Sequence, residues 1–277
     1  MKIRSINEFT TLNNGIRMPW LGFGVFQAQE GQEVIDAVKW ALEAGYRSID
    51  TAEVYGNETG VGRALRESGV PREEIFLTTK VSNNSQRLRR IQEAFNESLQ
   101  RLKVDYVDLY LIHWPVKDFY QDAWRELEKI YLDGRAKAIG VSNFLIHHLK
   151  GIFEISDRVP AVNQVEFHPH LIQTELIDFC KEKKIQVEAY SPLTKGKAVR
   201  LPQVIELAEK YQKTPAQIVL RWDLQHTVVT IPKSVHKDRI IANARLFDFE
   251  LSEDDMAAID ALDIGQRVGF DPDNVNF

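Results

Sequence analysis

Apolar residues follow two patterns along this chain. In the first, mostly apolar runs of five to seven residues recur at 20–24, 46–50, 75–80, 107–113, 136–142, 161–167, 185–191 and 227–232. Such runs are typical of buried strands. In the second, apolar residues recur every three or four positions, as at Val34, Val38, Ala41 and Leu42. This spacing predicts amphipathic helices between the strands, at 31–45, 58–69, 89–102, 122–134, 174–184, 201–212 and 215–225.

Eight strands alternating with helices predict an α/β fold. The chain has no linker, low-complexity segment or change of composition. We therefore expect residues 1–277 to form a single (β/α)8 TIM barrel domain. A doubly wound sheet is the competitor, but at this length it usually carries fewer strands or a visible second domain. An N-terminal β-hairpin is predicted ahead of the barrel, because the segments 9–12 and 16–19 flank the turn sequence "NNG".

Composition narrows the classes of function. Hydrophobic residues make up 44% and charged residues 27% of the chain, as in ordinary globular proteins. The net charge of −5 argues against nucleic-acid binding. No apolar run is long enough for a membrane span, and the first residues do not resemble a signal peptide. Because Cys180 is the single cysteine, no intrachain disulfide can form, and we expect a reducing, cytoplasmic location. We also expect a monomer whose partner is a small molecule.

Polar residues gather at the carboxyl ends of the predicted strands, where barrels place their active sites. They are Asp50, Lys80, His113, Ser142, Asn143, Gln164, Glu166, Tyr190, Ser191 and Lys233.

Four of the polar positions suggest one proton-transfer site. Asp50, Lys80 and His113 end the second, third and fourth strands, and Tyr55 lies in the stretch "DTAEVYGNE" just after Asp50. A tyrosine has an unperturbed pKa of about 10, so it is a weak acid unless a cation lowers that value. Lys80 could supply the cation, Asp50 could hold Lys80, and His113 could orient a carbonyl oxygen. Taken singly, each is more often structural, but their convergence on adjacent strands favours catalysis of carbonyl reduction.

A hydride donor needs a binding site, and the glycine-rich dinucleotide fingerprint is missing. "GFGVFQ" has Gln27 where the third glycine belongs, and "GVGRAL" lies inside a predicted helix. The segment 231–244 offers another cradle, because Lys233, Ser234 and Arg239 surround the start of a predicted helix. Two cations there favour the 2′-phosphate of NADPH over NADH. A capped surface helix with ordinary charges explains the same residues equally well. No His, Cys or carboxylate spacing predicts a metal site.

The ordered motifs resemble the aldo-keto reductase family along essentially the whole chain. They are "LGFGVF", "GYRSIDTAEVYGNE", "LTTK", "DLYLIHWP", "AIGVSNF", "VNQVEFHP", "AYSPL" and "IPKS" followed by Arg239 and Asn243. The chain most resembles small prokaryotic members that reduce glyoxals and sugar-derived ketones, such as 2,5-diketo-gluconate.

The resemblance implies a role for individual residues. Tyr55 would be the general acid, Lys80 would lower its pKa, Asp50 would pair with Lys80, and His113 would orient the substrate. NADPH or NADP⁺ would contact Gly22, Val25, Phe26, Asp50, Ser142, Asn143, Gln164, Tyr190, Ser191, Pro192, Leu193, Ile231, Lys233, Ser234, Val235, Arg239 and Asn243. The substrate pocket would comprise Phe26, Tyr55, Ser82, His113 and Trp114.

Two positions depart from the family pattern. Ala242 stands where a glutamate commonly precedes the adenine-side asparagine, which weakens one expected cofactor contact. Ser82 stands where a tryptophan often follows the catalytic lysine by two residues, so we expect a wider and more polar pocket.

The sequence therefore predicts an NADPH-dependent reductase of aldehydes and ketones. Two rival hypotheses stay open at this point. One is a Schiff-base aldolase that uses Lys80 as its nucleophile. The other is a regulatory or redox-sensing barrel that binds NADPH without catalysis.

Overall fold

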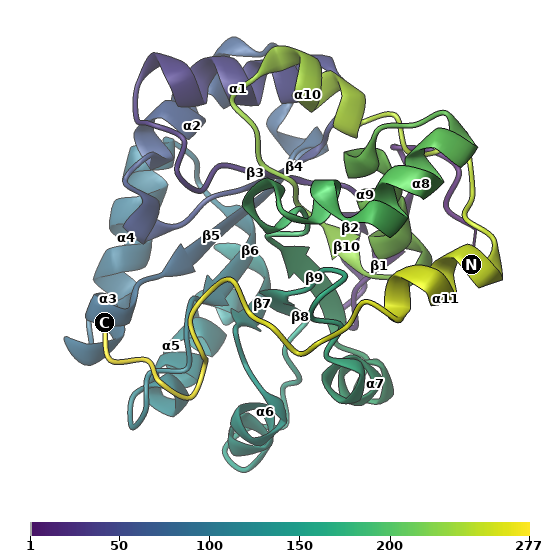
Figure 1. Ribbon diagram of the computed structural model, residues 1–277. Coiled ribbons are helices and arrows are strands. Elements are labelled where there is room, and N and C mark those ends of the chain that lie inside the picture. Colours follow the sequence, from purple (N-terminus) through teal and green to yellow (C-terminus); the bar gives the residue numbers. More distant parts are fainter. Residues whose placement is uncertain (1) are drawn as a thin grey trace.

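The computed structural model describes residues 2–277 and shows a barrel of parallel strands wrapped by helices (Figure 1). A separate antiparallel hairpin comes first, made of β1 (Phe9–Thr11) and β2 (Arg17–Pro19). The eight strands of the parallel sheet, which follow the chain order, are β3 (Phe23–Gly24), β4 (Ser48–Asp50), β5 (Phe76–Val81), β6 (Val107–Ile112), β7 (Ala136–Ser142), β8 (Val162–Glu166), β9 (Gln186–Tyr190) and β10 (Val229–Thr230). The (β/α)8 prediction is confirmed.

The first and last strands of the sheet meet, which closes the barrel. Leu21 and Thr230 form a parallel bridge, and the Gly22 N–H donates to the Thr230 carbonyl at 2.9 Å. A Cβ at Gly22 would lie 2.8 Å from the Ile231 side chain and 3.0 Å from that of Ser48. Because those neighbours leave no room, glycine allows this close approach of the two strands.

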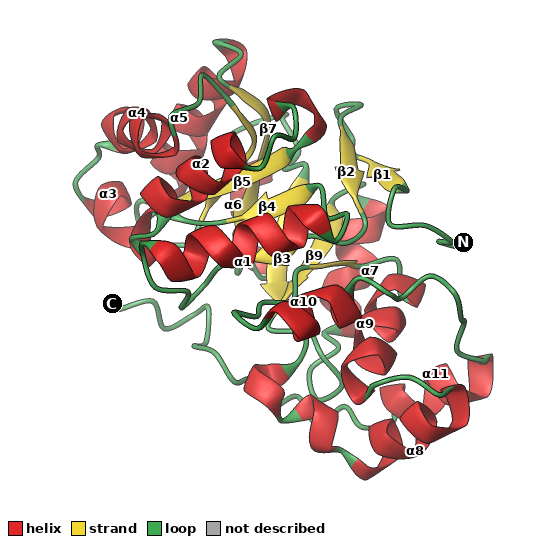
Figure 2. Cartoon of the chain, turned by 90° about the horizontal axis from the view of Figure 1, so that it is seen from above, coloured by secondary structure: helices red, strands yellow, loops and turns green. Residues whose placement is uncertain are grey.

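Helices cover the outside of the barrel, as Figure 2 shows from a second direction. In α1, the buried positions Val34, Val38, Ala41 and Leu42 form the apolar stripe that the sequence predicts. The helices are α1 (Gln32–Glu43), α2 (Glu58–Glu67), α3 (Asn83–Arg87), α4 (Ile91–Leu102), α5 (Tyr120–Leu132), α6 (Ile146–Phe153), α7 (Thr174–Glu182), α8 (Pro202–Tyr211), α9 (Pro215–Gln225), α10 (Lys237–Asn243) and α11 (Glu253–Asp260).

The hairpin lies against the amino-terminal end of the barrel. Its turn residues Asn13 and Asn14 donate to the carbonyls of Pro160, just before β8, and Lys137, the second residue of β7. Thr10 bonds Gln186 at the start of β9. The hairpin covers this end, so the opposite, carboxyl-terminal end is the one available for a functional site.

The segment after α11 runs along the carboxyl-terminal side of the barrel. Figure 1 shows it in yellow, passing the region of β8 and β7 and ending near α3. The N–H groups of Val268 and Gly269 both donate to the Glu166 carboxylate, at 2.6 and 3.0 Å. Arg87 of α3 donates to the carbonyls of Val275 and Phe277. We call residues 264–277 the tail.

Across residues 2–277, none of the helices combines the length and the apolar character that crossing a lipid bilayer requires.

Candidate active site

Asp50, Tyr55, Lys80 and His113 converge at the carboxyl-terminal end of the barrel. Asp50 is the last residue of β4, Tyr55 ends the 3-10 helix Glu53–Tyr55, Lys80 lies near the end of β5, and His113 follows β6. Lys80 Nζ donates to Asp50 Oδ1 at 2.6 Å and to the Tyr55 hydroxyl at 3.4 Å. The His113 ring lies edge-on to the Tyr55 ring, with centroids 5.6 Å apart.

The ammonium of Lys80 is fully buried and stays charged. Its third hydrogen bond goes to the Thr51 carbonyl at 2.9 Å. Burial alone would lower the pKa of Lys80, but the Asp50 carboxylate and the Tyr55 phenol together outweigh burial and raise it. A charged amine with all three donors engaged has no lone pair for attack on a carbonyl, which disfavours the Schiff-base hypothesis.

The phenol of Tyr55 is protonated at neutral pH. Burial raises its pKa, and the Lys80 ammonium opposes that rise. The net direction differs from the expected lowering, because burial, together with the nearby Asp50 carboxylate, outweighs the Lys80 ammonium. Lys80 donates to the phenolic oxygen, so the phenolic hydrogen is available to a second acceptor.

The imidazole of His113 is neutral. Burial lowers its pKa well below the usual value, and the Lys80 ammonium lowers it further. A neutral imidazole carries one N–H, and this can donate to a carbonyl oxygen without bringing a second charge beside Lys80.

A carboxyl group that sequence analysis missed faces this site from β9. Glu188 is fully buried, and its Oε2 accepts from Gln164 Nε2 at 2.7 Å. The same Nε2 donates to Asp50 Oδ2 at 2.8 Å. Burial and the facing Asp50 carboxylate raise the pKa of Glu188 to about 8. The signal in the sequence was an acidic residue inside an otherwise buried strand, two positions before Tyr190.

Ser142, Asn143 and Tyr190 form a hydrogen-bonded row beside Gln164. Ser142 Oγ donates to the backbone carbonyl of Gln164 at 2.9 Å, and the Tyr190 hydroxyl donates to Asn143 Oδ1 at 2.7 Å. The Asn143 amide also donates to the His113 carbonyl. Asn143 holds this place with a left-handed backbone, φ 66°, a conformation that asparagine tolerates better than most residues.

The first loop of the barrel approaches the same sector. The Val25 N–H donates to the Asp50 carbonyl at 3.1 Å, and the Phe26 ring lies 5.0 Å from that of Tyr55. Phe26 is half exposed, so its ring forms part of the rim of the site.

The residues expected to hold the adenosine half of a dinucleotide lie on two segments. Ser191, Pro192 and Leu193 follow β9, and residues 231–243 run from β10 through α10. Of these, Ile231 and Asn243 are buried, Val235 and Lys233 are half-buried, and Arg239 is exposed. Ser234 does not cap α10, because its Oγ accepts from the His236 N–H at 3.1 Å and His236 itself precedes the helix.

Neither Lys233 nor Arg239 forms a salt bridge with any residue in 2–277. Lys233 Nζ contacts only the Gln27 carbonyl, at 3.3 Å. Burial lowers the pKa of Lys233, with Glu33 opposing. Two cations without a carboxylate partner among residues 2–277, six positions apart in one segment, suit an anionic ligand.

Ser82 has a structural role that the sequence did not predict. It caps α3, a helix absent from the sequence-based expectations, because its Oγ accepts from the Ser85 N–H at 3.1 Å. Glu53 Oε2 in turn accepts from the Ser82 N–H at 2.8 Å. These bonds tie the segment after β5 to the segment that carries Tyr55.

The Trp114 side chain packs against the tail. Its ring contacts Phe277 and Phe270 edge-on, at centroid distances of 5.4 and 6.4 Å. The two phenylalanines pack on each other and remain largely exposed. Sequence analysis did not identify them, because nothing in their local pattern shows that the tail returns to the barrel.

The tail is also attached through Asp273, which lies between His147 and His148 of α6. Within residues 2–277 these three form the one cluster with the spacing of metal ligands. His148 Nδ1 accepts from the Leu145 N–H, and burial lowers the pKa of His148 to about 4. The neutral ring therefore carries its hydrogen on Nε2, which lies 3.4 Å from Asp273. A nitrogen that holds a hydrogen cannot bind a metal, so this cluster is better explained as a tail contact.

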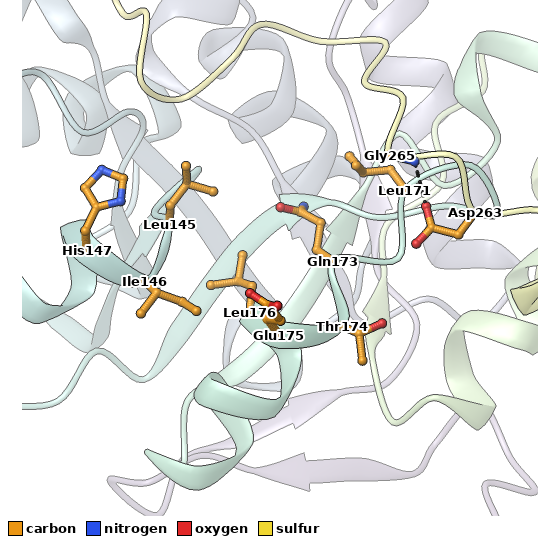
Figure 3. A pocket seen from close by; sticks show the side chains of 10 residues that line it. All are labelled: Leu145, Ile146, His147, Leu171, Gln173, Thr174, Glu175, Leu176, Asp263 and Gly265. Atoms are coloured by element: carbon orange, nitrogen blue, oxygen red, sulfur yellow. Dashed lines mark hydrogen bonds between the residues drawn. The ribbon is translucent and has the colours of Figure 1, made fainter.

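A separate surface hollow of about 520 Å³ lies between α6, α7 and the start of the tail (Figure 3). A hydrogen bond from the Gly265 N–H to Asp263 shapes its edge. None of the four converging residues lines it. Its lining residues are Leu145, Ile146, His147, Leu171, Gln173, Thr174, Glu175, Leu176, Asp263 and Gly265.

Known proteins resemble this chain over nearly its full length. The sequence model described as "Aldo/keto reductase family" matches residues 20–264. Glyoxal reductase of Bacillus subtilis (strain 168) is 54% identical over 273 residues, covering 99% of both chains. Methylglyoxal reductase DkgA of Escherichia coli (strain K12) is 48% identical over 266 residues, covering 95% of this chain and 96% of the relative.

A solved structure resembles this chain in both fold and sequence. MGS-M4, an aldo-keto reductase enzyme from a Medee basin deep-sea metagenome library, superimposes with a TM-score of 0.93 at 44% identity. The comparison covers 97% of this chain and 100% of that one.

Proposed function

The chain belongs to the aldo-keto reductase family of oxidoreductases, and on that premise we propose that it reduces small aldehydes and ketones to alcohols with NADPH. Glyoxal-type dicarbonyls and keto-sugars are the expected substrates. The names of two relatives, a glyoxal reductase and a methylglyoxal reductase, support the dicarbonyls.

The contact of Lys80 with both Asp50 and Tyr55 carries this proposal. It places a protonated phenol beside a fixed cation at the open end of the barrel. A carbonyl oxygen gains negative charge when hydride adds to its carbon. Tyr55 gives its proton to that oxygen, and the Lys80 ammonium stabilises the phenolate that remains. Asp50 keeps the ammonium in place and balances its charge.

His113 orients the substrate in this scheme. Its neutral ring donates one N–H toward the carbonyl oxygen, and its edge-on contact with Tyr55 keeps the two groups on the same side of the site. The rings of Phe26 and Trp114 border the site and exclude water from the reacting atoms.

The residues present fit a dinucleotide phosphate. Lys233 and Arg239 lack carboxylate partners among residues 2–277 and would hold the 2′-phosphate. Ser142, Asn143 and Gln164 would bind the nicotinamide carboxamide, and Tyr190 would pack on the ring. Bound NADPH supplies the hydride.

Turnover in the presence of NADPH tests the proposal. Purified protein should consume NADPH absorbance when methylglyoxal or a keto-sugar is added, and more slowly with NADH. Borohydride trapping of the substrate on Lys80 would instead support the Schiff-base hypothesis. NADPH binding without turnover of any aldehyde, dicarbonyl or keto-sugar would support the regulatory one.

A further inference from the structure

Glu188 is a buried acid for which the proposed chemistry has no use. It lies on β9 inside the barrel, where it pairs in register with Gln164 of β8 and Val229 of β10. Its Oε2 accepts from Gln164, and its Oε1 has no partner among residues 2–277. A polar group in such a place costs free energy unless it serves a purpose or meets a ligand or water.

The two carboxyl groups around Gln164 fix the orientation of its side-chain amide. Asp50 Oδ2 and Glu188 Oε2 lie 2.8 and 2.7 Å from the same end of the amide. The ionised Asp50 can only accept, so the NH₂ group must face it, and an uncharged Glu188 accepts from the same NH₂ group through Oε2 as its carbonyl oxygen, with its proton on Oε1. The side-chain carbonyl oxygen of Gln164, Oε1, then points the other way, and it accepts no hydrogen bond from residues 2–277. A single carboxylate would satisfy one amide hydrogen, whereas the pair satisfies both.

We propose that Glu188 is a positioning residue, which in its uncharged form holds the Gln164 amide so that its carbonyl oxygen accepts from the nicotinamide carboxamide. This inference rests on the proposed function, because it needs a nicotinamide at Gln164. Glu188 itself does not touch the cofactor in this scheme.

The charges around Glu188 explain why it stays neutral. The groups that face it are Asp50 of β4, Lys80 of β5 and Tyr55 after β4, while β8 and β10 contribute Gln164 and Val229, which do not titrate. Asp50 already neutralises Lys80. A second carboxylate in this enclosed space would be uncompensated, which is costly. Burial is the largest cause, and the Asp50 carboxylate the second, of the rise in the pKa of Glu188 to about 8. The pKa values of Lys80 and Tyr55 are raised as well, so Lys80 stays charged and Tyr55 stays protonated.

Binding of two oxidised dinucleotides tests the positioning role directly. One is NADP⁺, and the other is its 3-acetylpyridine analogue, in which an acetyl group without N–H replaces the carboxamide. Quenching of tryptophan fluorescence gives each Kd without any turnover. One hydrogen bond to Gln164 should make wild type prefer NADP⁺ about threefold to tenfold.

The variants separate positioning from simple folding. In Glu188→Leu the preference should fall below about twofold, because the amide loses one of its two anchors. In Glu188→Gln it should return, because the new carbonyl accepts from Gln164 in the same place. The exposed Glu182→Leu serves as a matched control and should keep the preference of wild type. A folded Glu188→Leu that keeps the full preference would overturn the inference.

A pH series gives a second readout if Glu188→Leu does not fold. Above pH 8 the ionised Glu188 adds a negative charge near the nicotinamide, and the oxidised ring is cationic. Wild type should therefore bind NADP⁺ increasingly better than NADPH between pH 7 and 9, whereas Glu188→Gln should show no such change. Identical pH profiles would overturn the inference and leave the proposed function intact. Failure of wild type to bind either dinucleotide would overturn both.

Discussion

Lys80 Nζ lies 2.6 Å from Asp50 Oδ1, and both side chains are almost completely shielded from solvent. A buried pair of this kind is strongly coupled, because removal of either partner leaves the other charge without compensation. Lys80→Met should thus lower the free energy of unfolding by about 3–5 kcal/mol. Urea denaturation followed by circular dichroism measures this loss.

The double variant supplies the control for that pair. Lys80→Met combined with Asp50→Asn should be more stable than Lys80→Met alone, since no unpaired charge remains. Additive losses from the two substitutions would show that the charges are not coupled.

Loss of the Tyr55 hydroxyl should affect chemistry and spare cofactor binding. Tyr55→Phe keeps the ring and removes the proton donor, so kcat for methylglyoxal should fall about 10²- to 10⁴-fold. The Kd for NADPH should change by less than about threefold, because only the phenol oxygen is lost. Tyr131→Phe, which alters a phenol on the outer helix α5, is the matched control. Retention of most activity in Tyr55→Phe would remove Tyr55 from the mechanism.

Lys233 and Arg239 should select NADPH over NADH. Replacing either with methionine removes one cation that has no carboxylate partner in the described part of the chain, so the Kd for NADPH should rise roughly tenfold in each variant. The Kd for NADH, which lacks the 2′-phosphate, should stay the same. Lys237→Met on the same helix is the control, because Lys237 already faces Glu43 at 3.7 Å. Equal losses for both cofactors would place the phosphate elsewhere.

Ser82 should affect both the enzyme's preference for substrates of different size and the stability of the N-terminal end of α3. Ser82→Trp should raise KM for bulky or hydroxylated carbonyls relative to methylglyoxal, since the indole would narrow the pocket. It should also cost about 0.5–2 kcal/mol, because the cap of α3 is lost. Ser82→Ala loses the same cap without filling space, so it separates the two effects. An unchanged substrate profile in Ser82→Trp would contradict a pocket role for this position.

The raised pKa of Glu188 predicts that the stability of the fold depends on pH. Its pKa is about 8 in the folded protein and 4.5 in an exposed reference state, so between these values the folded state holds one more proton. Stability from this group is complete below pH 4.5 and declines as pH rises to 8, by about 1.4 kcal/mol per pH unit at most. Glu188→Gln should remove this slope. Denaturation of both proteins from pH 5 to 8 measures the difference, and parallel curves would contradict the prediction.

Local patterns predicted more of the fold than of the site. The apolar runs located the eight strands, and the three- and four-residue spacing located helices such as α1. The short helix α3 escaped notice because five residues give too little periodicity to detect. The four polar residues at the strand ends were recognisable because a parallel barrel brings every strand's carboxyl end to one face.

The sequence by itself thus determined the order of elements, the turn at Asn13 to Gly15 and the candidates at the strand ends, because these depend on residues close together in the chain. Only the tertiary structure decided that Gln164 lies between Asp50 and Glu188, 114 and 24 residues away. It also decided that the tail returns to Glu166 across 102 residues. Such contacts depend on the register and closure of the barrel, which set the distances between strands and leave no trace in the local pattern.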